Sequence, residues 1–211
     1  EEFEFQGPKV NPLTFTMVSK KKKKKGVKEF IEAAKIIKKK YPSIKFLLVG
    51  PLSNNPDAIS EKELSLMLLD SSVEYIGPSD NVKEILYHSS VFVLPSYYGE
   101  GVPRTILEAM AVGLPIITTN NVGCKETVIQ EKNGFLVEPQ DVPSLSNSIE
   151  QSIQNQDLLL SMGEKSRQLA GEFFDVNVIN KKMTTTITRN LKAFTYPETQ
   201  TKKEETAPER P

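Results

Sequence analysis

The chain has 211 residues, of which 38% are hydrophobic and 26% are charged, and its formal net charge is zero. This balance is typical of a soluble globular domain that buries a core, and it excludes a general electrostatic attraction to nucleic acid or membranes. The single cysteine excludes an intramolecular disulfide and fits a reducing compartment, and no apolar stretch approaches the roughly 20 residues of a membrane-spanning helix.

The first twelve residues begin with an acidic stretch, EEFEF, which is followed by Gly7 and Pro8. This composition is unlike a signal peptide and resembles a linker. We therefore expect residues 1–12 to be the remnant of an interdomain linker, in a chain that begins in the middle of a longer protein.

Apolar runs of strand length alternate with amphipathic segments along most of the chain. The predicted strands cover 13–19, 44–50, 73–77, 91–95, 115–119 and 134–139. The predicted helices cover 26–41, 63–71, 82–90, 103–113, 143–153, 156–174 and 175–194, and a short helix is expected within 123–129. This alternation predicts an α/β fold with a parallel, doubly wound sheet, which binds ligands at the carboxyl ends of its strands.

Polar residues are expected to begin several of these helices. Ser60 and Glu63 have the spacing of a capping box, and Asp80 and Asp141 each precede a helical segment. Beyond residue 194 the sequence is rich in proline, threonine and charge. We therefore expect one domain over 13–194 and a disordered tail over 195–211.

Two carboxylates, Glu100 and Glu108, bracket the segment between the strand at 91–95 and the next helix. Glu100 is expected at the carboxyl edge of the sheet, where it can accept hydrogen bonds from sugar hydroxyls. Glu108 lies about 7.5 Å beyond Pro103 along the helix axis, where a carboxylate can hold a diol such as ribose. The spacing alone leaves open the alternative of two solvated glutamates in an ordinary loop.

The start of this helix is suited to an anion. Pro103 has no N–H group, and Arg104 and Thr105 follow it with N–H groups that the first helical turn leaves without an intrahelical acceptor. The helix dipole adds to their attraction for a phosphate. The segment therefore predicts sites for a sugar, a diphosphate and a ribose in a row.

A run of lysines, Lys20–Lys25, fills the loop after the first predicted strand. Lys20 and Lys25 are expected to face the same crevice and to neutralise a diphosphate, whereas Lys21 to Lys24 are expected to form a solvated face. Contact of the run with anionic lipid is an open alternative. A nucleic-acid patch is disfavoured, because no aromatic residues interleave the lysines.

The remaining reactive side chains are interpreted as structural. His88 ends a helix before a strand, and Cys124 lies in a loop without a nearby histidine that would activate it. No complete GxGxxG pattern follows the first strand, which argues against a nicotinamide enzyme. The sequence also lacks a P-loop and an Asp-x-Asp pair for a metal-bound nucleotide.

Several long segments carry a resemblance to a known family. KGVKEFIEAAKIIKKKYPSIKFLLVGP, VEYIG, VFVLPSYYGEGVPRTILEAMAVGLPIITTN, GCKETV and NGFLVEP follow in this order. From about Leu13 to Phe194 the chain resembles the family 4 retaining glycosyltransferases. Their GT-B fold has two Rossmann-like domains facing across a cleft, and this chain resembles the C-terminal, donor-binding one.

The resemblance implies roles for individual residues. Glu100 corresponds to the catalytic carboxylate that contacts the transferred sugar, and Glu108 to the carboxylate that holds the ribose. The other implied donor-binding residues are Gly77 and Ser79 near the base, Gly101 and Val102 in the loop after Glu100, and Lys20, Lys25, Arg104 and Thr105 at the phosphates. No metal or other cofactor is implied.

Two departures from the family bear on these roles. Lys20 stands where arginine is usual, and losing the bidentate guanidinium is expected to weaken phosphate binding. Lys21 stands where an apolar residue is usual, so the loop is open to rearrangement. The chain is also expected to lack the acceptor domain of these enzymes, and by itself to bind a donor without transferring it.

The implied activity is transfer of a sugar, with retention of its anomeric configuration, from a nucleotide-diphosphate sugar, with UDP favoured as the nucleotide. The implied partners are this donor and a glycan or lipid-linked acceptor, with no nucleic acid. The expected location is the cytoplasm, with the inner face of the membrane as an open alternative. A non-catalytic nucleotide-sugar-binding module and a nucleotide-sugar epimerase of related fold are open alternative functions.

Overall fold

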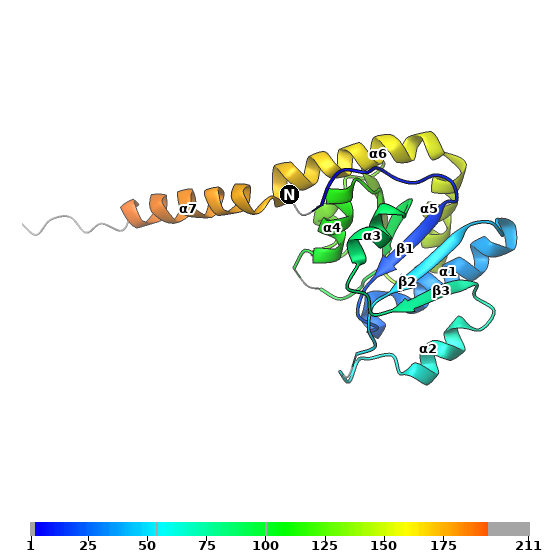
Figure 1. Cartoon of the computed structure of the whole chain (residues 1–211). Coiled ribbons are helices and arrows are strands. Elements are labelled where there is room, and N and C mark those ends of the chain that lie inside the picture. Colours follow the sequence, from blue (N-terminus) through cyan, green and yellow to red (C-terminus); the bar gives the residue numbers. More distant parts are fainter. Residues whose placement is uncertain (1–2, 54, 100, 194–211) are drawn as a thin grey trace, which may run out of the picture. The chain divides into compact units, whose positions relative to one another are not determined.

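The computed structural model describes residues 3–53, 55–99 and 101–193, with side chains up to residue 188. Contacts divide the chain into two compact units, Glu1–Phe174 and Asp175–Pro211. One sheet of parallel strands forms the centre of the first unit, in the order β3-β2-β1-β4-β5-β6 (Figure 1). The strands are β1 (Thr14–Val18), β2 (Lys45–Val49), β3 (Val73–Gly77), β4 (Val91–Leu94), β5 (Ile116–Thr119) and β6 (Gly134–Val137). The predicted parallel, doubly wound α/β sheet is therefore confirmed.

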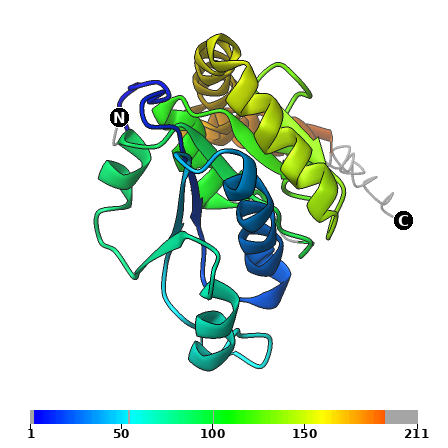
Figure 2. The same cartoon turned by 90° about the vertical axis from the view of Figure 1, so that its right-hand side faces the viewer.

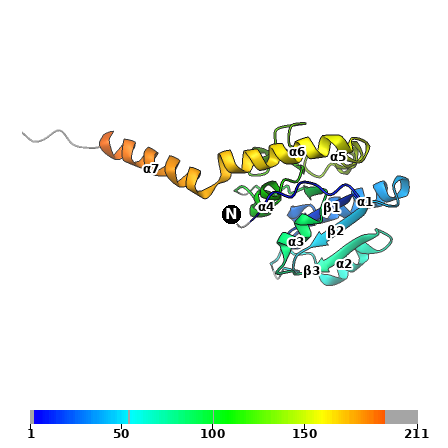
Figure 3. The same ribbon diagram turned by 45° about the horizontal axis from the view of Figure 1, so that its top comes forward.

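Helices cover both faces of this sheet. They are α1 (Val27–Lys40), α2 (Glu61–Leu68), α3 (Val82–Tyr87), α4 (Arg104–Val112), α5 (Val142–Gln154) and α6 (Gln156–Leu169). Short helical turns lie at η1 (Lys23–Lys25), η2 (Lys125–Thr127) and η3 (Ala170–Phe174). Because crossovers between parallel strands are right-handed, α1 and α2 lie on one face and α3 and α4 on the other. Figure 2 shows α5 beside α1, and Figure 3 shows α6 over α4.

The direction of winding reverses between β1 and β4. From β1 the chain proceeds to β2 and β3 on one side, and from β4 it proceeds to β5 and β6 on the other. Sheets of this kind bind ligands beyond the carboxyl ends of the strands at such a reversal. The lysine run follows β1 and the segment leading to α4 follows β4. The topology therefore places the two candidate segments side by side.

Gly26 allows these two loops to approach closely. It has φ of 80°, a left-handed conformation that side chains disfavour, and a Cβ added there would lie 2.2 Å from the carbonyl oxygen of Pro95. Next to this contact, the Tyr97 N–H donates to the Lys24 carbonyl over 3.0 Å. The glycine after the lysine run is therefore required by the packing of the β1–α1 loop against the end of β4.

Two of the three expected helix caps are present. The Ser60 hydroxyl accepts from the Glu63 N–H over 3.2 Å, and a Glu63 carboxylate oxygen accepts from the Ser60 N–H over 2.8 Å. The Asp141 side chain likewise caps α5. The expected cap by Asp80 is wrong, because α3 begins one residue later than that cap requires, with Asn81 as the flanking residue and no side-chain cap.

The segment before β1 is part of the first unit and bonds to the end of α4 and to the residues after α3. The Gln6 N–H donates to the Val112 carbonyl over 2.9 Å, and the Lys9 N–H donates to the Ser89 carbonyl over 3.0 Å. The expected domain division at residues 12 and 194 stays a prediction, and the expected tail over 195–211 lies outside the described residues.

The second unit contains α7 (Val176–Ala193), which begins after an Asp175 carboxylate that accepts from the Asn177 N–H over 2.8 Å. This helix agrees with the prediction over 175–194 as far as residue 193. In the described part of the chain, no helix is both long enough and apolar enough to cross a membrane.

Candidate functional site

A cavity of about 270 Å³ lies at the carboxyl edge of the sheet, between the loop after β1 and the start of α4. Its walls combine cationic side chains from the lysine run with the first turn of a helix. The lining residues are Val18, Ser19, Lys20, Lys22, Lys25, Leu94, Pro103, Arg104 and Thr105. We call this space the β1–α4 cavity. It brings together four of the residues that the sequence selects for phosphate binding, Lys20, Lys25, Arg104 and Thr105.

The start of α4 gives this cavity an electropositive wall. Pro103 flanks the helix with φ of −65°, and its carbonyl accepts from the Ile106 N–H over 3.0 Å. The N–H groups of the first turn have no acceptor within the helix, and the helix dipole places partial positive charge at this end. Side-chain ammonium groups and backbone N–H groups thus line the same space, an arrangement suited to a diphosphate.

Glu108 lies one turn into α4 and does not line the cavity. A Glu108 carboxylate oxygen accepts from the Arg104 Nε over 2.9 Å. The side chain of Glu108 is 17% exposed, whereas that of Arg104 is 83% exposed, so the carboxylate is largely covered while its arginine partner lies in solvent. The carboxylate has a second oxygen with which to accept from a ligand hydroxyl.

The residues expected near a base lie apart from the cavity. Gly77 ends β3 with φ of 80°, and its carbonyl accepts from the Gly50 N–H over 2.7 Å. The Ser79 hydroxyl accepts from the Asn81 N–H over 3.1 Å. Gly77 is the last residue of β3 and Ser79 follows it, at the same carboxyl edge of the sheet. Their expected role at the base stays a prediction.

The loop after β4 is described only in part. Gly101 is exposed, and a Cβ added to it would meet no atom within 4 Å. Val102 is half-buried and, like Gly101, does not line the β1–α4 cavity. The expected catalytic residue, Glu100, lies outside the described residues, so its assignment also stays a prediction.

Lys21 differs from its expected place on a solvated face, and that prediction is wrong. Its side chain is fully buried, and its Nζ donates to the Ser19 carbonyl over 2.8 Å and to the Val49 carbonyl over 2.6 Å. The ammonium also lies 5.3 Å from the centre of the Tyr75 ring. Burial lowers the pKa of Lys21 to about 7. The resembled family usually has an apolar residue at this position, and that was the signal in the sequence that the Lys21 side chain faces inward.

The rest of the run is held by the loop after β2, which the sequence did not indicate. The Lys23 N–H donates to the Asp57 carbonyl over 2.9 Å. The ammonium of Lys23 lies 3.5 Å from a Glu63 oxygen, and that of Lys24 lies 3.7 Å from an Asp57 oxygen. These pairs are exposed and contribute little stability. Their consequence is geometric, since they turn Lys23 and Lys24 away from the β1–α4 cavity, which Lys22 lines instead.

His88 and Cys124 have structural surroundings. The His88 Nδ1 lies 2.8 Å from the Glu84 carbonyl at the end of α3, and Cys124 is buried beside η2. Across the described ranges, no three histidine, cysteine, aspartate or glutamate side chains gather in a way that could hold a metal ion.

Comparisons with known proteins place this geometry in context. The family described as Glycosyl transferases group 1 matches residues 1–169. The chain is 33% identical over 158 residues to N,N'-diacetylbacillosaminyl-diphospho-undecaprenol alpha-1,3-N-acetylgalactosaminyltransferase of Campylobacter jejuni, covering 75% of this chain and 40% of that protein. It is 36% identical over 147 residues to UDP-Gal:alpha-D-GlcNAc-diphosphoundecaprenol alpha-1,3-galactosyltransferase of Escherichia coli, covering 68% of this chain and 37% of that protein.

Solved structures share the fold. Alr3699/HepE of Anabaena, solved in complex with UDP, matches with a TM-score of 0.75 at 24% identity, covering 85% of this chain and 50% of that one. The chain therefore spans half or less of the length of each of these three proteins.

Proposed function

We propose that this chain, which belongs to the glycosyl transferases group 1 family, is the donor-binding part of a glycosyltransferase that uses a nucleotide-diphosphate sugar. The observation that carries the proposal is the β1–α4 cavity, where Lys20 and Lys25 face the start of α4 at the reversal of the sheet. The solved relative that contains UDP has the same fold, which supports UDP as the nucleotide.

The diphosphate is the part of the donor that the cavity serves best. The Lys20 and Lys25 ammonium groups and the first-turn N–H groups of Arg104 and Thr105 can offset the charge that develops on the diphosphate when the bond to the sugar breaks. Fixed cations of this kind do the work that a metal ion does in other nucleotide sites, and we propose transfer without a metal or other cofactor.

The flanking residues extend this arrangement along the donor. Glu108 is proposed to accept hydrogen bonds from the ribose hydroxyls, because its carboxylate is held one helical turn beyond the phosphate-facing residues. Gly77 and Ser79, which lie at and just after the end of β3 at the same edge of the sheet, are proposed to hold the base. Gly101 and Val102 are proposed to complete the loop around the sugar.

Glu100 is proposed to contact the transferred sugar, and transfer is proposed to retain the anomeric configuration, as in a family 4 hexosyltransferase. The Glu100→Ala variant should bind UDP with nearly unchanged affinity while losing any preference for a UDP-sugar over UDP. Calorimetric titration with both ligands measures this, and equal losses for the two would contradict the assignment.

The acceptor is proposed to be a glycan or a glycan linked to a lipid, because two relatives are named for acceptors on diphospho-undecaprenol. Such an acceptor supports a location in the cytoplasm at the inner face of the membrane. Since the chain spans 40% of the first of these relatives, we propose that by itself it binds donor without transferring it. A non-catalytic module would bind the donor in the same way as half of a glycosyltransferase. The two functions are separated only by adding an acceptor-binding half and measuring whether sugar is then transferred.

Contact of the lysine run with the membrane is the weaker part of this proposal. Lys21 is buried, and Lys23 and Lys24 pair with acidic side chains, which leaves a smaller basic surface than the run suggests. Pelleting with vesicles that contain anionic lipid, at rising salt, would test it.

Titration of UDP, GDP and ADP into the chain tests the central proposal. UDP should bind, and Lys25→Gln should weaken it by roughly tenfold, the loss of one charge-assisted contact. Lys23→Gln is the matched control, because Lys23 belongs to the same run but points away from the cavity. Failure of all three nucleotides to bind, or equal effects of the two substitutions, would overturn the proposal.

A further inference from the structure

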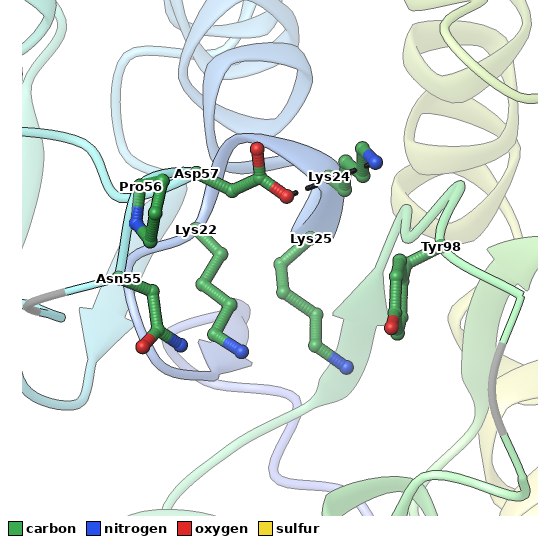
Figure 4. Close-up of a pocket in the computed structure, with 7 residues that line it drawn as sticks. All are labelled: Lys22, Lys24, Lys25, Asn55, Pro56, Asp57 and Tyr98. Atoms are coloured by element: carbon green, nitrogen blue, oxygen red, sulfur yellow. Dashed lines mark ion pairs between the residues drawn. The ribbon is translucent and has the colours of Figure 1, made fainter.

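The β1–α4 cavity adjoins a second cavity of about 270 Å³, which lies among the lysine run, the loop after β2 and the loop after β4. Lys22 and Lys25 line both cavities. Figure 4 shows the second cavity, with the ion pair of Lys24 and Asp57 at its wall. These two shared lysines do not distinguish the cavities, whereas Ser19 lines only the β1–α4 cavity.

The Ser19 hydroxyl is a buried polar group without a partner. Ser19 directly follows β1, and the residue as a whole is partly exposed. Among the described residues, its hydroxyl oxygen makes no hydrogen bond although it is shielded from solvent. One oxygen of Glu29 shares this property, but Glu29 lies on α1 and lines neither cavity. Buried polar groups in proteins are nearly always hydrogen-bonded, so the Ser19 hydroxyl is an exception at the wall of the proposed phosphate site.

The backbone of Ser19 is held against the end of β2. Its N–H donates to the Val49 carbonyl over 3.0 Å, and its carbonyl accepts from the buried Lys21 Nζ over 2.8 Å. The same Nζ donates to the Val49 carbonyl over 2.6 Å. Gly50 packs so closely that a Cβ added to it would lie 2.3 Å from the Ser19 carbonyl oxygen. The backbone that carries the Ser19 side chain is therefore fixed at the wall of the cavity.

The side chain of Ser19 can still rotate. A serine has one heavy-atom side-chain torsion with three staggered positions, and no hydrogen bond selects one of them here. A hydroxyl donates one hydrogen bond, and the bond is stronger when the acceptor is an anionic oxygen. Lys20 and the first turn of α4 line the same cavity and attract an anion to it. A phosphate bound there would supply the partner that the hydroxyl lacks.

We propose that Ser19 is a donor-binding residue whose hydroxyl donates a hydrogen bond to the diphosphate of the nucleotide sugar, an inference that rests on the proposed function. The hydroxyl adds a neutral hydrogen-bond donor to the ammonium and backbone N–H groups assigned to the phosphates. A serine side chain loses far less rotamer freedom on binding than a lysine side chain does. With its backbone fixed, Ser19 can therefore hold one phosphate oxygen at a small cost in entropy.

The test compares Ser19→Ala with the unaltered chain in calorimetric titrations of UDP and of inorganic pyrophosphate. Both ligands should bind Ser19→Ala roughly tenfold more weakly, the loss of one hydrogen bond to a charged group. The effect should be equal for the two because the contact is to the diphosphate, whereas Glu108→Ala is expected to spare pyrophosphate. Ser65→Ala is the matched control, since Ser65 is exposed on α2 and lines neither cavity. It should change either affinity by less than about twofold.

The stability of Ser19→Ala separates a binding role from a structural one. Removing a hydroxyl that has no partner should leave the free energy of unfolding in urea unchanged or higher. A lower free energy of unfolding would show that the hydroxyl supports the fold, and would overturn the inference. Affinities that stay within about twofold of the unaltered chain, or a loss for only one of the two ligands, would also overturn it and leave the donor site standing.

The result for the unaltered chain separates this inference from the proposed function. If UDP does not bind, the proposed function fails. Pyrophosphate binding that Ser19→Ala weakens would then retain the contact between Ser19 and a diphosphate. Pyrophosphate binding that Ser19→Ala leaves unchanged, or failure of both ligands to bind, would overturn both proposals.

Discussion

At the scale of single residues, Lys21 shows that the position of a side chain in the fold, and not its charge, can decide whether it is buried. It belongs to an unbroken run of lysines, yet its ammonium is enclosed between the carboxyl ends of β1 and β2. Its two carbonyl acceptors and the Tyr75 ring compensate only part of the lost hydration, and the pKa of Lys21 falls to about 7. The same side chain ties the lysine loop to the neighbouring strand.

This burial predicts a pH dependence of stability. Below pH 7 Lys21 is protonated in both the folded and unfolded states, so its contribution does not vary with pH. Between about pH 7 and 10 only the unfolded state holds the proton, so the free energy of unfolding should rise with pH, by at most roughly 1.4 kcal/mol per unit. Urea unfolding at pH 6 to 9 measures the rise. Lys21→Met should remove it and Lys23→Met should not; a rise in both variants would assign it to another group.

Glu108 yields a second prediction at this scale. Glu108→Ala should weaken UDP binding by roughly tenfold or more, because hydrogen bonds to a charged group contribute about 1.5–3 kcal/mol. Binding of inorganic pyrophosphate, which has no ribose, should remain within about twofold of wild type. Calorimetry with both ligands separates the ribose contact from a general loss of the site.

Arg104→Ala is the control for that substitution, because it breaks the same ion pair but keeps the carboxylate and the backbone N–H. It should lose less UDP affinity than Glu108→Ala. A larger loss of UDP affinity in Arg104→Ala than in Glu108→Ala would show that Glu108 acts only by holding the guanidinium.

At the scale of elements, the β1–α1 loop is positioned by packing with two other loops. Gly26 brings it against Pro95 at the end of β4, and the Lys21 N–H and carbonyl bond to Pro51 and Ile59 of the loop after β2. The two cavities are therefore defined where three loops meet, all of them at the carboxyl edge of the sheet.

Gly26→Ala should disturb this arrangement. The left-handed backbone alone costs a residue with a side chain about 1–2 kcal/mol, and the approach to the Pro95 carbonyl adds to it. We expect the free energy of unfolding, measured by urea denaturation, to fall by at least that amount, and UDP to bind more weakly. Gly99→Ala is the matched control, since its Cβ would meet no atom within 4 Å; similar losses in both would refute the explanation.

At the scale of the whole molecule, the reversal of the sheet between β1 and β4 organises the site. The proposed diphosphate would lie across this reversal, held by side chains from the loop after β1 and by backbone groups of α4. Excess EDTA should therefore leave the dissociation constant for UDP within about twofold, because fixed cations replace a metal. A tenfold loss that added magnesium restores would contradict metal-free binding.

The elements of the fold were largely predictable from the sequence. Apolar periodicity located the strands and helices to within a few residues, since period and burial follow from backbone geometry. The capping box at Ser60 and Glu63 was predictable for the same local reason, whereas the cap expected from Asp80 was wrong because α3 begins at Val82, so that Asn81 and not Asp80 occupies the capping position. The family resemblance is confirmed for the glycosyl transferases group 1 family, and the narrower family 4 assignment stays a prediction.

The sequence by itself determined the parallel sheet and placed Lys20, Lys25, Arg104 and Thr105 at one edge of it, because the loops after parallel strands all emerge at that edge. The strand order that brings β1 beside β4 came from the tertiary structure. Only the tertiary structure decided that the lysines of the run have different environments, with Lys21 buried and Lys22 lining two cavities. The reason is physical: whether a loop side chain is buried, paired or facing a cavity depends on loops that are distant in sequence, and local periodicity carries no information about those contacts.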